Sequence, residues 1–164
     1  MLGIYLIFDT IASFKGAPFV ASGRWVVAEI LKNANLRKGQ RFLELGSGDG
    51  RVVREAVKKY GVKGIGVEFH PLLVWYSRFL SKIFKVKGVE FIKGNFFKAD
   101  LSKADVIYMF LLPKTMDKLK LKILKECKKG ALLISHGFKI RGLERYLILQ
   151  TPRHTFSTYY YKLK

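Results

Sequence analysis

The chain has 164 residues, of which 49% are hydrophobic and 26% are charged, so it is long and apolar enough for one globular domain and is not an intrinsically disordered chain. Its 31 Lys and Arg against 12 Asp and Glu give a formal net charge of +19. This charge indicates acidic partners such as nucleic acid, anionic lipid or an acidic protein face, or else a lysine-covered surface with no specific partner. The single cysteine, Cys127, excludes an internal disulfide, offers no metal cluster and fits a reducing, cytoplasmic setting.

The chain begins with a strongly apolar run at residues 1–14. This run is shorter than the ~20 residues that span a bilayer, and no basic residue precedes it as in a secretory signal. Two interpretations stay open: an arm packed on the domain, or a helix that lies on an anionic membrane surface and makes the protein peripherally membrane-associated. We therefore predict an N-terminal arm at residues 1–21 and a single domain at residues 22–164.

From Arg24 onward, segments with helical spacing alternate with short apolar runs. The spacing predicts helices over 24–33, 51–60, 71–84 and 114–126, the last one burying Met116, Leu119, Ile123 and Leu124. Strands are predicted over 42–45, 63–68, 89–92, 105–110 and 131–135, followed by a hairpin of strands 145–150 and 155–162. This order predicts an α/β fold, with a Rossmann-like, seven-stranded, mostly parallel sheet, helices on both faces and a C-terminal antiparallel hairpin.

The connections between these elements are short. Residues 93–104 leave room for only a turn of helix, and residues 137–144 form a short loop. No connection is long enough for a deep lid, so the expected binding site is open. An open site favours a large substrate whose reactive group reaches in from solution.

Three glycines at alternate positions, Gly46, Gly48 and Gly50, separate the first strand from the next helix. A strand, a glycine turn and a helix bring backbone amides close to a nucleotide-like ligand, with no space for a Cβ. The spacing G-x-G-x-G differs from the G-x-G-x-x-G of dinucleotide sites, and the turn lacks the lysine of a P-loop.

Acidic residues near this turn indicate the charge of the ligand. Glu44 lies at the strand end and Asp49 within the turn, where they would repel a pyrophosphate and suit a ligand with an amino group and a sulfonium. Glu68 ends the second strand, where such folds bind ribose hydroxyls. Together these motifs resemble the class I, seven-strand methyltransferases that use S-adenosylmethionine (SAM).

The position after the fourth strand bears on the methyl acceptor. Enzymes that methylate amide or exocyclic amino nitrogens carry Asn/Asp-Pro-Pro-aromatic there, whereas this chain has apolar residues 110–112 and Pro113. A lysine amine that has lost its proton to solvent needs no built-in base, and methyl transfer to it depends mainly on alignment. Aromatic rings can line a lysine channel. The candidates are Phe96, Phe110, His136 and Phe138.

Several segments carry a closer resemblance. Residues 93–97, 100–102, 109–112 and 135–138 are similar to those of small archaeal broad-specificity protein lysine methyltransferases. Residues 45–51 and 73–78 are similar to those of the mitochondrial enzymes that methylate lysine in the adenine nucleotide translocase and the ATP synthase c-subunit. The resemblance implies SAM as the methyl donor and a protein lysine as the acceptor, including lysines of membrane proteins.

The resemblance also implies site residues. Glu44 and the three glycines would hold the methionine part of SAM, Glu68 the ribose, and Asn95 with Phe96 the adenine. His70 stands where the family often has Asn, and it would cap the following helix or bond the ribose. The full cofactor-binding set is Glu44, Gly46, Ser47, Gly48, Asp49, Gly50, Glu68, Phe69, His70, Asn95, Phe96 and Phe110. Phe110 and His136 are the substrate-channel candidates, without a firm general base, and no metal is expected.

Two alternatives from other classes stay open. The basic charge is compatible with an RNA or tRNA methyltransferase, which is not favoured because the polar motif at 110–113 and an added RNA-binding domain are missing. The other alternative is a catalytically silent SAM-binding scaffold.

Overall fold

The computed structural model of the chain describes residues 23–152 and 155–163. The predictions made for residues 1–14, and the boundary at residue 21, lie outside the described residues. Within the described ranges, no helix has the length and the apolar character to cross a membrane.

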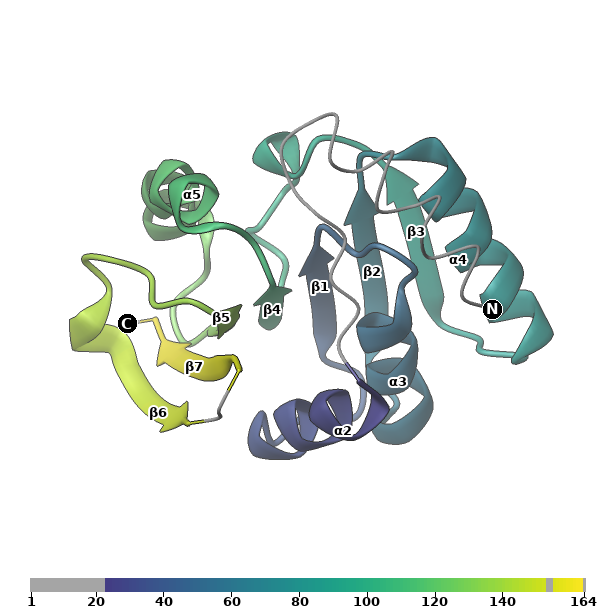
Figure 1. Ribbon diagram of the computed structural model, residues 1–164, viewed down its shortest axis with the longest axis horizontal. Coiled ribbons are helices and arrows are strands. Elements are labelled where there is room, and N and C mark those ends of the chain that lie inside the picture. The colour runs from purple at the N-terminus through teal and green to yellow at the C-terminus, as the bar shows by residue number, and fades with distance from the viewer. Residues whose placement is uncertain (1–22, 153–154, 164) are drawn as a thin grey trace.

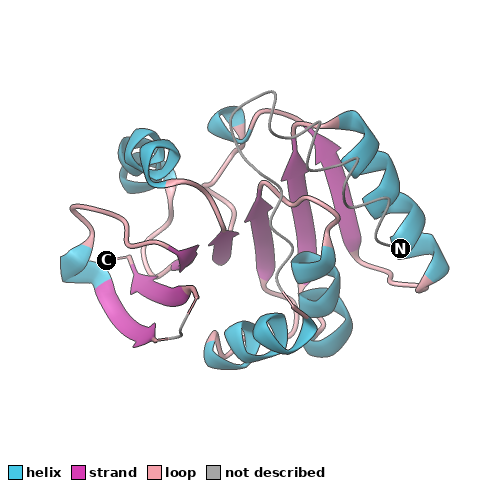
Figure 2. Cartoon of the chain, in the orientation of Figure 1, coloured by secondary structure: helices cyan, strands magenta, loops and turns pink. Residues whose placement is uncertain are grey.

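The described elements follow the predicted alternation of strands and helices (Figures 1 and 2). In chain order they are α2 (Arg24–Asn33), β1 (Arg41–Leu45), α3 (Arg51–Tyr60), β2 (Lys63–Glu68), α4 (Pro71–Ile83), β3 (Val89–Lys93), the 3₁₀ turn η1 (Phe96–Lys98), β4 (Val106–Met109), α5 (Pro113–Glu126), β5 (Leu132–Gly137), the 3₁₀ turn η2 (Glu144–Tyr146), β6 (Leu147–Thr151) and β7 (Ser157–Lys162).

The strands form one seven-stranded sheet in the order β3-β2-β1-β4-β5-β7-β6. The first five strands pair in parallel, and β7 and β6 add antiparallel strands at one edge. The predicted fold class is therefore confirmed. The strand order reverses between β1 and β4, where Leu45 pairs with Met109. In open α/β sheets the crevice at the carboxyl ends of such strands is where ligands bind.

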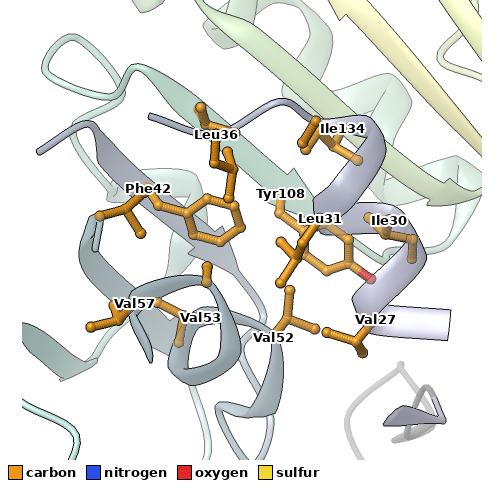
Figure 3. Close-up of a cluster of buried hydrophobic side chains, with 14 of the residues drawn as sticks. Val27, Ile30, Leu31, Leu36, Phe42, Val52, Val53, Val57, Tyr108 and Ile134 are labelled. Carbon is orange, nitrogen blue, oxygen red and sulfur yellow. The ribbon is translucent and has the colours of Figure 1, made fainter. Parts of the chain in front are cut away.

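Two apolar cores flank the sheet. On one face, side chains of α2 and α3 pack around Phe42 and Tyr108 of the sheet, as Figure 3 shows, and α4 contributes Val74. On the other face, α5 packs against Leu45 and its neighbours in β4 and β5. Helices therefore cover both faces of the sheet. The loops that build the site follow the carboxyl ends of the parallel strands.

The prediction for the inward face of α5 was wrong at one position. Met116, Leu119 and Ile123 are buried, whereas Leu124 is 43% exposed. A helix turns about 100° per residue, so Leu124 projects well away from Ile123 and clears the edge of the contact with the sheet.

The C-terminal part also differs from the prediction in detail. Residues 144–146 form η2, so β6 begins at Leu147 rather than at residue 145. The last strand begins at Ser157, where pairing with Gly137 starts, and β5 extends to that glycine instead of ending at residue 135. These ends depend on which partner strand is available, and the local pattern of apolar residues does not contain that information.

Candidate active site

The glycine turn between β1 and α3 lies against the end of β2. The amides of Gly46 and Ser47 both donate to the carbonyl of Val67, with N–O distances of 2.9 and 3.1 Å. Gly46, Gly48 and Gly50 all have positive φ, at 73°, 53° and 73°. L-residues with a Cβ rarely adopt this left-handed conformation, so the alternate glycines are what allow the turn to fold back along the strand end.

Carboxylates occupy the N-terminus of α3. The amide of Val53 donates to the carboxylate of Glu44 at 3.0 Å, and the amide of Arg51 donates to the carboxylate of Asp49 at 3.0 Å. A phosphate binds a helix N-terminus through such first-turn amides. Because two of them already donate to carboxylates, this helix start is suited to a cationic group rather than to a phosphate, in line with the sequence-based expectation.

Asp49 makes its polar contacts with two arginines of the following helix, α3. Its carboxylate forms an ion pair with the Arg51 guanidinium, 2.6 Å between Nη2 and Oδ2, and its backbone carbonyl accepts a hydrogen bond from buried Arg54. Sequence reasoning missed Arg54. Arg54 stands at an inward position of a short amphipathic helix, and this position could have identified it, because a buried charge requires a partner.

Glu44 lies beneath the turn and is only 4% exposed. Burial raises the pKa of this carboxyl well above its ordinary value, against the lowering effect of the Val53 hydrogen bond, and the nearby negative charge of Asp49 raises it further. The contact that the structure shows for Glu44 is with Val53. Its predicted contact with the methionine part of the cofactor stays a prediction.

The raised pKa gives a pH-dependent stability that can be measured. A carboxyl whose pKa is higher in the folded chain stabilises the fold fully below its unfolded pKa of about 4.3, and this contribution is lost as the pH rises through the folded pKa. Glu44→Gln keeps an acceptor for Val53 and removes the titration. We therefore expect the free energy of unfolding of the wild type, measured in urea, to fall relative to that of the variant as the pH rises from about 4 to 8. A difference that stays constant over this range would contradict the assignment.

Glu68, at the end of β2, bridges two loops. One carboxylate oxygen accepts the amide hydrogen of Gly48 at 2.9 Å, and the other accepts that of His70 at 2.9 Å. The residue is half-buried, and these two hydrogen bonds fix its carboxylate in place. This is the geometry of a carboxylate that can accept hydrogen bonds from a pair of vicinal hydroxyls.

His70 occupies the N-cap position of α4, as predicted, but its side chain makes no capping hydrogen bond, so that part of the prediction was wrong. Its Nδ1 is buried and has no hydrogen-bond partner among the described residues, and the same is true of the hydroxyl of Ser47. Buried polar groups are normally hydrogen-bonded, so these two unpaired groups, on the glycine turn and at the start of α4, are candidates to bond a polar ligand.

The predicted adenine-side residues lie at the end of β3. Asn95 caps η1 by accepting the amide hydrogen of Phe97 at 2.9 Å, and Phe96 is half-buried against the core on the α5 side of the sheet. Phe69 is 52% exposed at the start of α4. The chain therefore brings the candidates from three strand ends to one edge of the sheet.

The helix α4 is fastened to the glycine turn by a residue that sequence reasoning missed. The hydroxyl of buried Ser77 lies 3.0 Å from the carbonyl of Gly48 and 2.8 Å from that of Leu73. A serine on the buried side of an otherwise apolar helix was the available signal.

Aromatic rings gather at the carboxyl ends of β4 and β5. Phe110 and His136 meet edge to face with 4.7 Å between their centroids, and Phe156 lies 5.2 Å from Phe110 and 6.3 Å from Phe138. Of the four predicted channel residues, three are thus in one cluster, while Phe96 pairs with Phe97 instead. Phe156 was not predicted.

His136 is held inside this aromatic cluster. It is 3% exposed, and its Nδ1 lies 2.9 Å from the hydroxyl of Thr158 on β7. The glycine turn lies close to the segment after β4, since a Cβ placed on Gly46 would lie 3.1 Å from Leu111. The part of the chain that the structure describes contains no group of three or more His, Cys, Asp or Glu side chains arranged to hold a metal ion.

The residues present fit SAM. They supply a half-buried carboxylate for ribose at Glu68, buried carboxyl groups at Glu44 and Asp49, and polar atoms without a partner at Ser47 and His70. The helix N-terminus, which would bind the pyrophosphate of a dinucleotide, is already satisfied by carboxylates.

Comparisons with known proteins also indicate a methyltransferase. The ANTKMT methyltransferase domain family matches residues 44–146. A protein-lysine N-methyltransferase of Saccharolobus islandicus (strain REY15A) is 39% identical over 129 residues, 76% of this chain and 79% of that protein. The human ATP synthase c-subunit lysine N-methyltransferase is 33% identical over 74% of this chain, which spans about half of that protein, 52%.

Solved structures share the fold. The crystal structure of an RNA methyltransferase from Salinibacter ruber in complex with S-adenosyl-L-homocysteine superposes with a TM-score of 0.83 and 30% sequence identity, and the match covers 88% of this chain and 94% of that one.

Proposed function

Because this chain belongs to the ANTKMT methyltransferase domain family, we propose that it is a protein-lysine N-methyltransferase whose acceptor is the ε-amino group of lysine in protein substrates. The observation that carries this proposal is the 39% identity to a protein-lysine N-methyltransferase across three-quarters of the chain. We also propose that residues 22–164 form the methyltransferase domain.

SAM is the methyl donor, and when bound it supplies a methyl group on a sulfonium. In our proposal the chain contributes a cradle. Glu68 accepts the ribose hydroxyls, the turn at 46–50 follows the methionine part, and Asn95 with Phe96 lies beside the adenine. The carboxyl of Glu44 favours the positive charges of the donor, whereas the carboxylate of Asp49 is already paired with Arg51. Orientation of the reacting groups, rather than a built-in base, supplies most of the rate.

The aromatic cluster is proposed as the mouth through which the lysine enters. Phe110, His136 and Phe156 present ring edges and faces at the ends of β4 and β5, next to the glycine turn. Apolar surroundings lower the pKa of an amine and leave more of it deprotonated for attack. Lysine side chains of membrane proteins are among the candidates, since curated relatives carry the name ATP synthase c-subunit lysine N-methyltransferase.

One observation favours a second candidate function. The RNA methyltransferase of Salinibacter ruber matches almost the whole of both chains, and the net charge of +19 suits a polyanionic substrate. An RNA substrate would bind with strong salt dependence, whereas a lysine acceptor in a protein has no such general requirement.

Methyl transfer from labelled SAM distinguishes these functions. The purified chain is incubated with separate pools of soluble protein, membrane protein and RNA, with Glu68→Ala as the control that should bind little SAM. We expect label in protein, resistant to nuclease and recovered as methyl-lysine after hydrolysis. Label in RNA alone would replace the lysine assignment. Binding of SAM without label in any pool would support a silent scaffold.

The role of the aromatic cluster can be tested separately from cofactor binding. Phe156 is half-buried and packs edge to face on Phe110, so Phe156→Ala should loosen the ring arrangement. We expect kcat/KM for methyl transfer to fall about tenfold while the Kd for SAM changes less than about twofold. Ile148→Ala, an exposed position in the same hairpin, serves as the control. A parallel loss of SAM affinity would place Phe156 in the cofactor site instead.

A further inference from the structure

The helix α4 exposes large apolar side chains on the side that faces away from the sheet. Leu72, Trp75, Phe79 and Ile83 are 51%, 63%, 46% and 58% exposed, and we call this set the α4 aromatic face. At about 100° per residue these four positions fall on one stripe of the helix. Trp75 and Phe79 stack with 5.6 Å between ring centroids. A soluble domain normally places charged or polar residues on such a stripe.

The opposite face of α4 is closed to these side chains. It packs on β2 and β3 with Leu73, Val74, Ser77 and Ser81, all of them buried. The two serines are small, and both bond backbone carbonyls, Ser77 those of Gly48 and Leu73 and Ser81 that of Ser77. Because these four residues occupy the side of the helix that packs on the sheet, the α4 aromatic face points away from the sheet. Figure 1 shows α4 lying along β3 at one end of the sheet.

The charged residues of α4 and of the loop after it are all basic. The sequence contains no Asp or Glu from residue 69 to residue 89, a stretch that includes all of α4 and the loop after it. The same stretch carries four exposed cations: Lys82, Lys85, Lys87 and Arg78, whose guanidinium also donates to the carbonyl of Phe91. The nearest acids along the chain are Glu68, which is bound to the glycine turn, and Glu90 on β3.

We propose that the α4 aromatic face docks on the surface of an anionic lipid bilayer. Tryptophan, phenylalanine and leucine on one helix face with basic residues beside them are the pattern of helices that lie in the membrane interface. The aromatic side chains enter the boundary between headgroups and acyl chains, and the four cations meet anionic headgroups.

Charge argues against the other occupants of this face. A second copy of the chain would bring another net charge of +19 to a basic surface, which opposes self-association. The apolar residues 1–14 include one acid, Asp9, too few for four cations. Because α4 begins three residues after Glu68, a docked helix would hold the proposed SAM site next to the bilayer. The docking does not depend on the acceptor being lysine.

Vesicle flotation of the full chain tests the proposal. We expect binding to vesicles of phosphatidylcholine with phosphatidylglycerol, weakening with added salt, and little binding to phosphatidylcholine alone. The double variant Trp75→Gln/Phe79→Gln should bind at least about tenfold more weakly. The control Leu121→Gln/Ile148→Gln removes two apolar side chains that are 74% and 61% exposed on α5 and β6, and it should bind like the wild type.

Both double variants are checked for wild-type SAM affinity and urea unfolding, so that a folding defect is not mistaken for lost docking. Wild-type binding by the α4 variant, or absence of wild-type binding to anionic vesicles, would overturn the proposal. The first result would also assign any membrane binding to another part of the chain.

Tryptophan fluorescence gives an independent readout, because the chain has two tryptophans and Trp25→Phe leaves only Trp75. We expect Trp75 to be quenched by acrylamide in solution, and to shift to the blue and become quenched by brominated lipid on anionic vesicles. Shielding of Trp75 without vesicles would overturn the proposal. If that shielding is independent of protein concentration, the chain itself covers the face, and if it grows with concentration, a second copy does.

Discussion

Glu68→Ala is expected to lower the affinity of the chain for SAM about 100-fold or more. The carboxylate is fixed by the amides of Gly48 and His70, both at 2.9 Å, so it meets a ligand without reorganising. Hydrogen bonds to a charged acceptor contribute about 1.5–3 kcal/mol each, and losing two of them accounts for the expected factor. Titration calorimetry with SAM and with S-adenosylhomocysteine measures the loss directly.

The control for this experiment is Glu90→Ala on the neighbouring strand β3. It makes the same change in charge at an exposed position, and we expect SAM affinity to change less than about twofold. Comparable losses in the two variants would mean that overall charge, rather than a contact at Glu68, determines affinity. Unchanged binding by Glu68→Ala would remove the ribose contact from the proposed site.

Gly50→Ala is expected to destabilise the chain by about 3 kcal/mol and to disturb the cofactor turn. Gly50 has a φ of 73°, and a Cβ there would lie 2.3 Å from the ring of Phe91. That ring is 3% exposed and belongs to the core under α3, so it cannot move aside freely. The left-handed conformation contributes about 1–2 kcal/mol and the overpacking about 1–3 kcal/mol. Urea unfolding measures the sum.

Gly39→Ala separates the two contributions. Gly39 has a φ of 84°, and a Cβ there would meet nothing within 4 Å, so only the conformational part applies. We expect it to lower the free energy of unfolding by about 1 kcal/mol. Equal effects at the two glycines would show that the Phe91 ring yields, and that Gly50 is required for its backbone conformation alone.

The fold was predictable because the local pattern of apolar residues indicates the type of each element. Alternation of short apolar strands with helical spacing gave the seven strands, and the short links left little choice of topology. Element ends were less predictable, as at β5 and β7, where pairing with the partner strand decides the last residues. Leu124 was placed inward on helical spacing, yet the width of the contact with the sheet leaves it exposed.

Part of the candidate site was likewise predictable from the sequence, and part was not. The glycine turn and the acids at the ends of β1 and β2 were found from the sequence, because they follow buried strands that must end at one edge of a sheet. The partners of these acids were not found. That Glu68 holds Gly48, and that Ser77 reaches the same residue from α4, depends on how three elements meet in space.

Residue types and their spacing along the chain establish a glycine turn with acidic neighbours, an apolar position after the fourth strand, and an excess of positive charge. These are local properties, since they depend on residue types within a few positions. Three features emerge from the folded chain instead: Phe156 joins Phe110 and His136, carboxylates occupy the start of α3, and α4 turns its aromatic residues outward. Strand order and the packing of small serines under α4 produce these contacts between distant residues, and no periodicity along the chain encodes them.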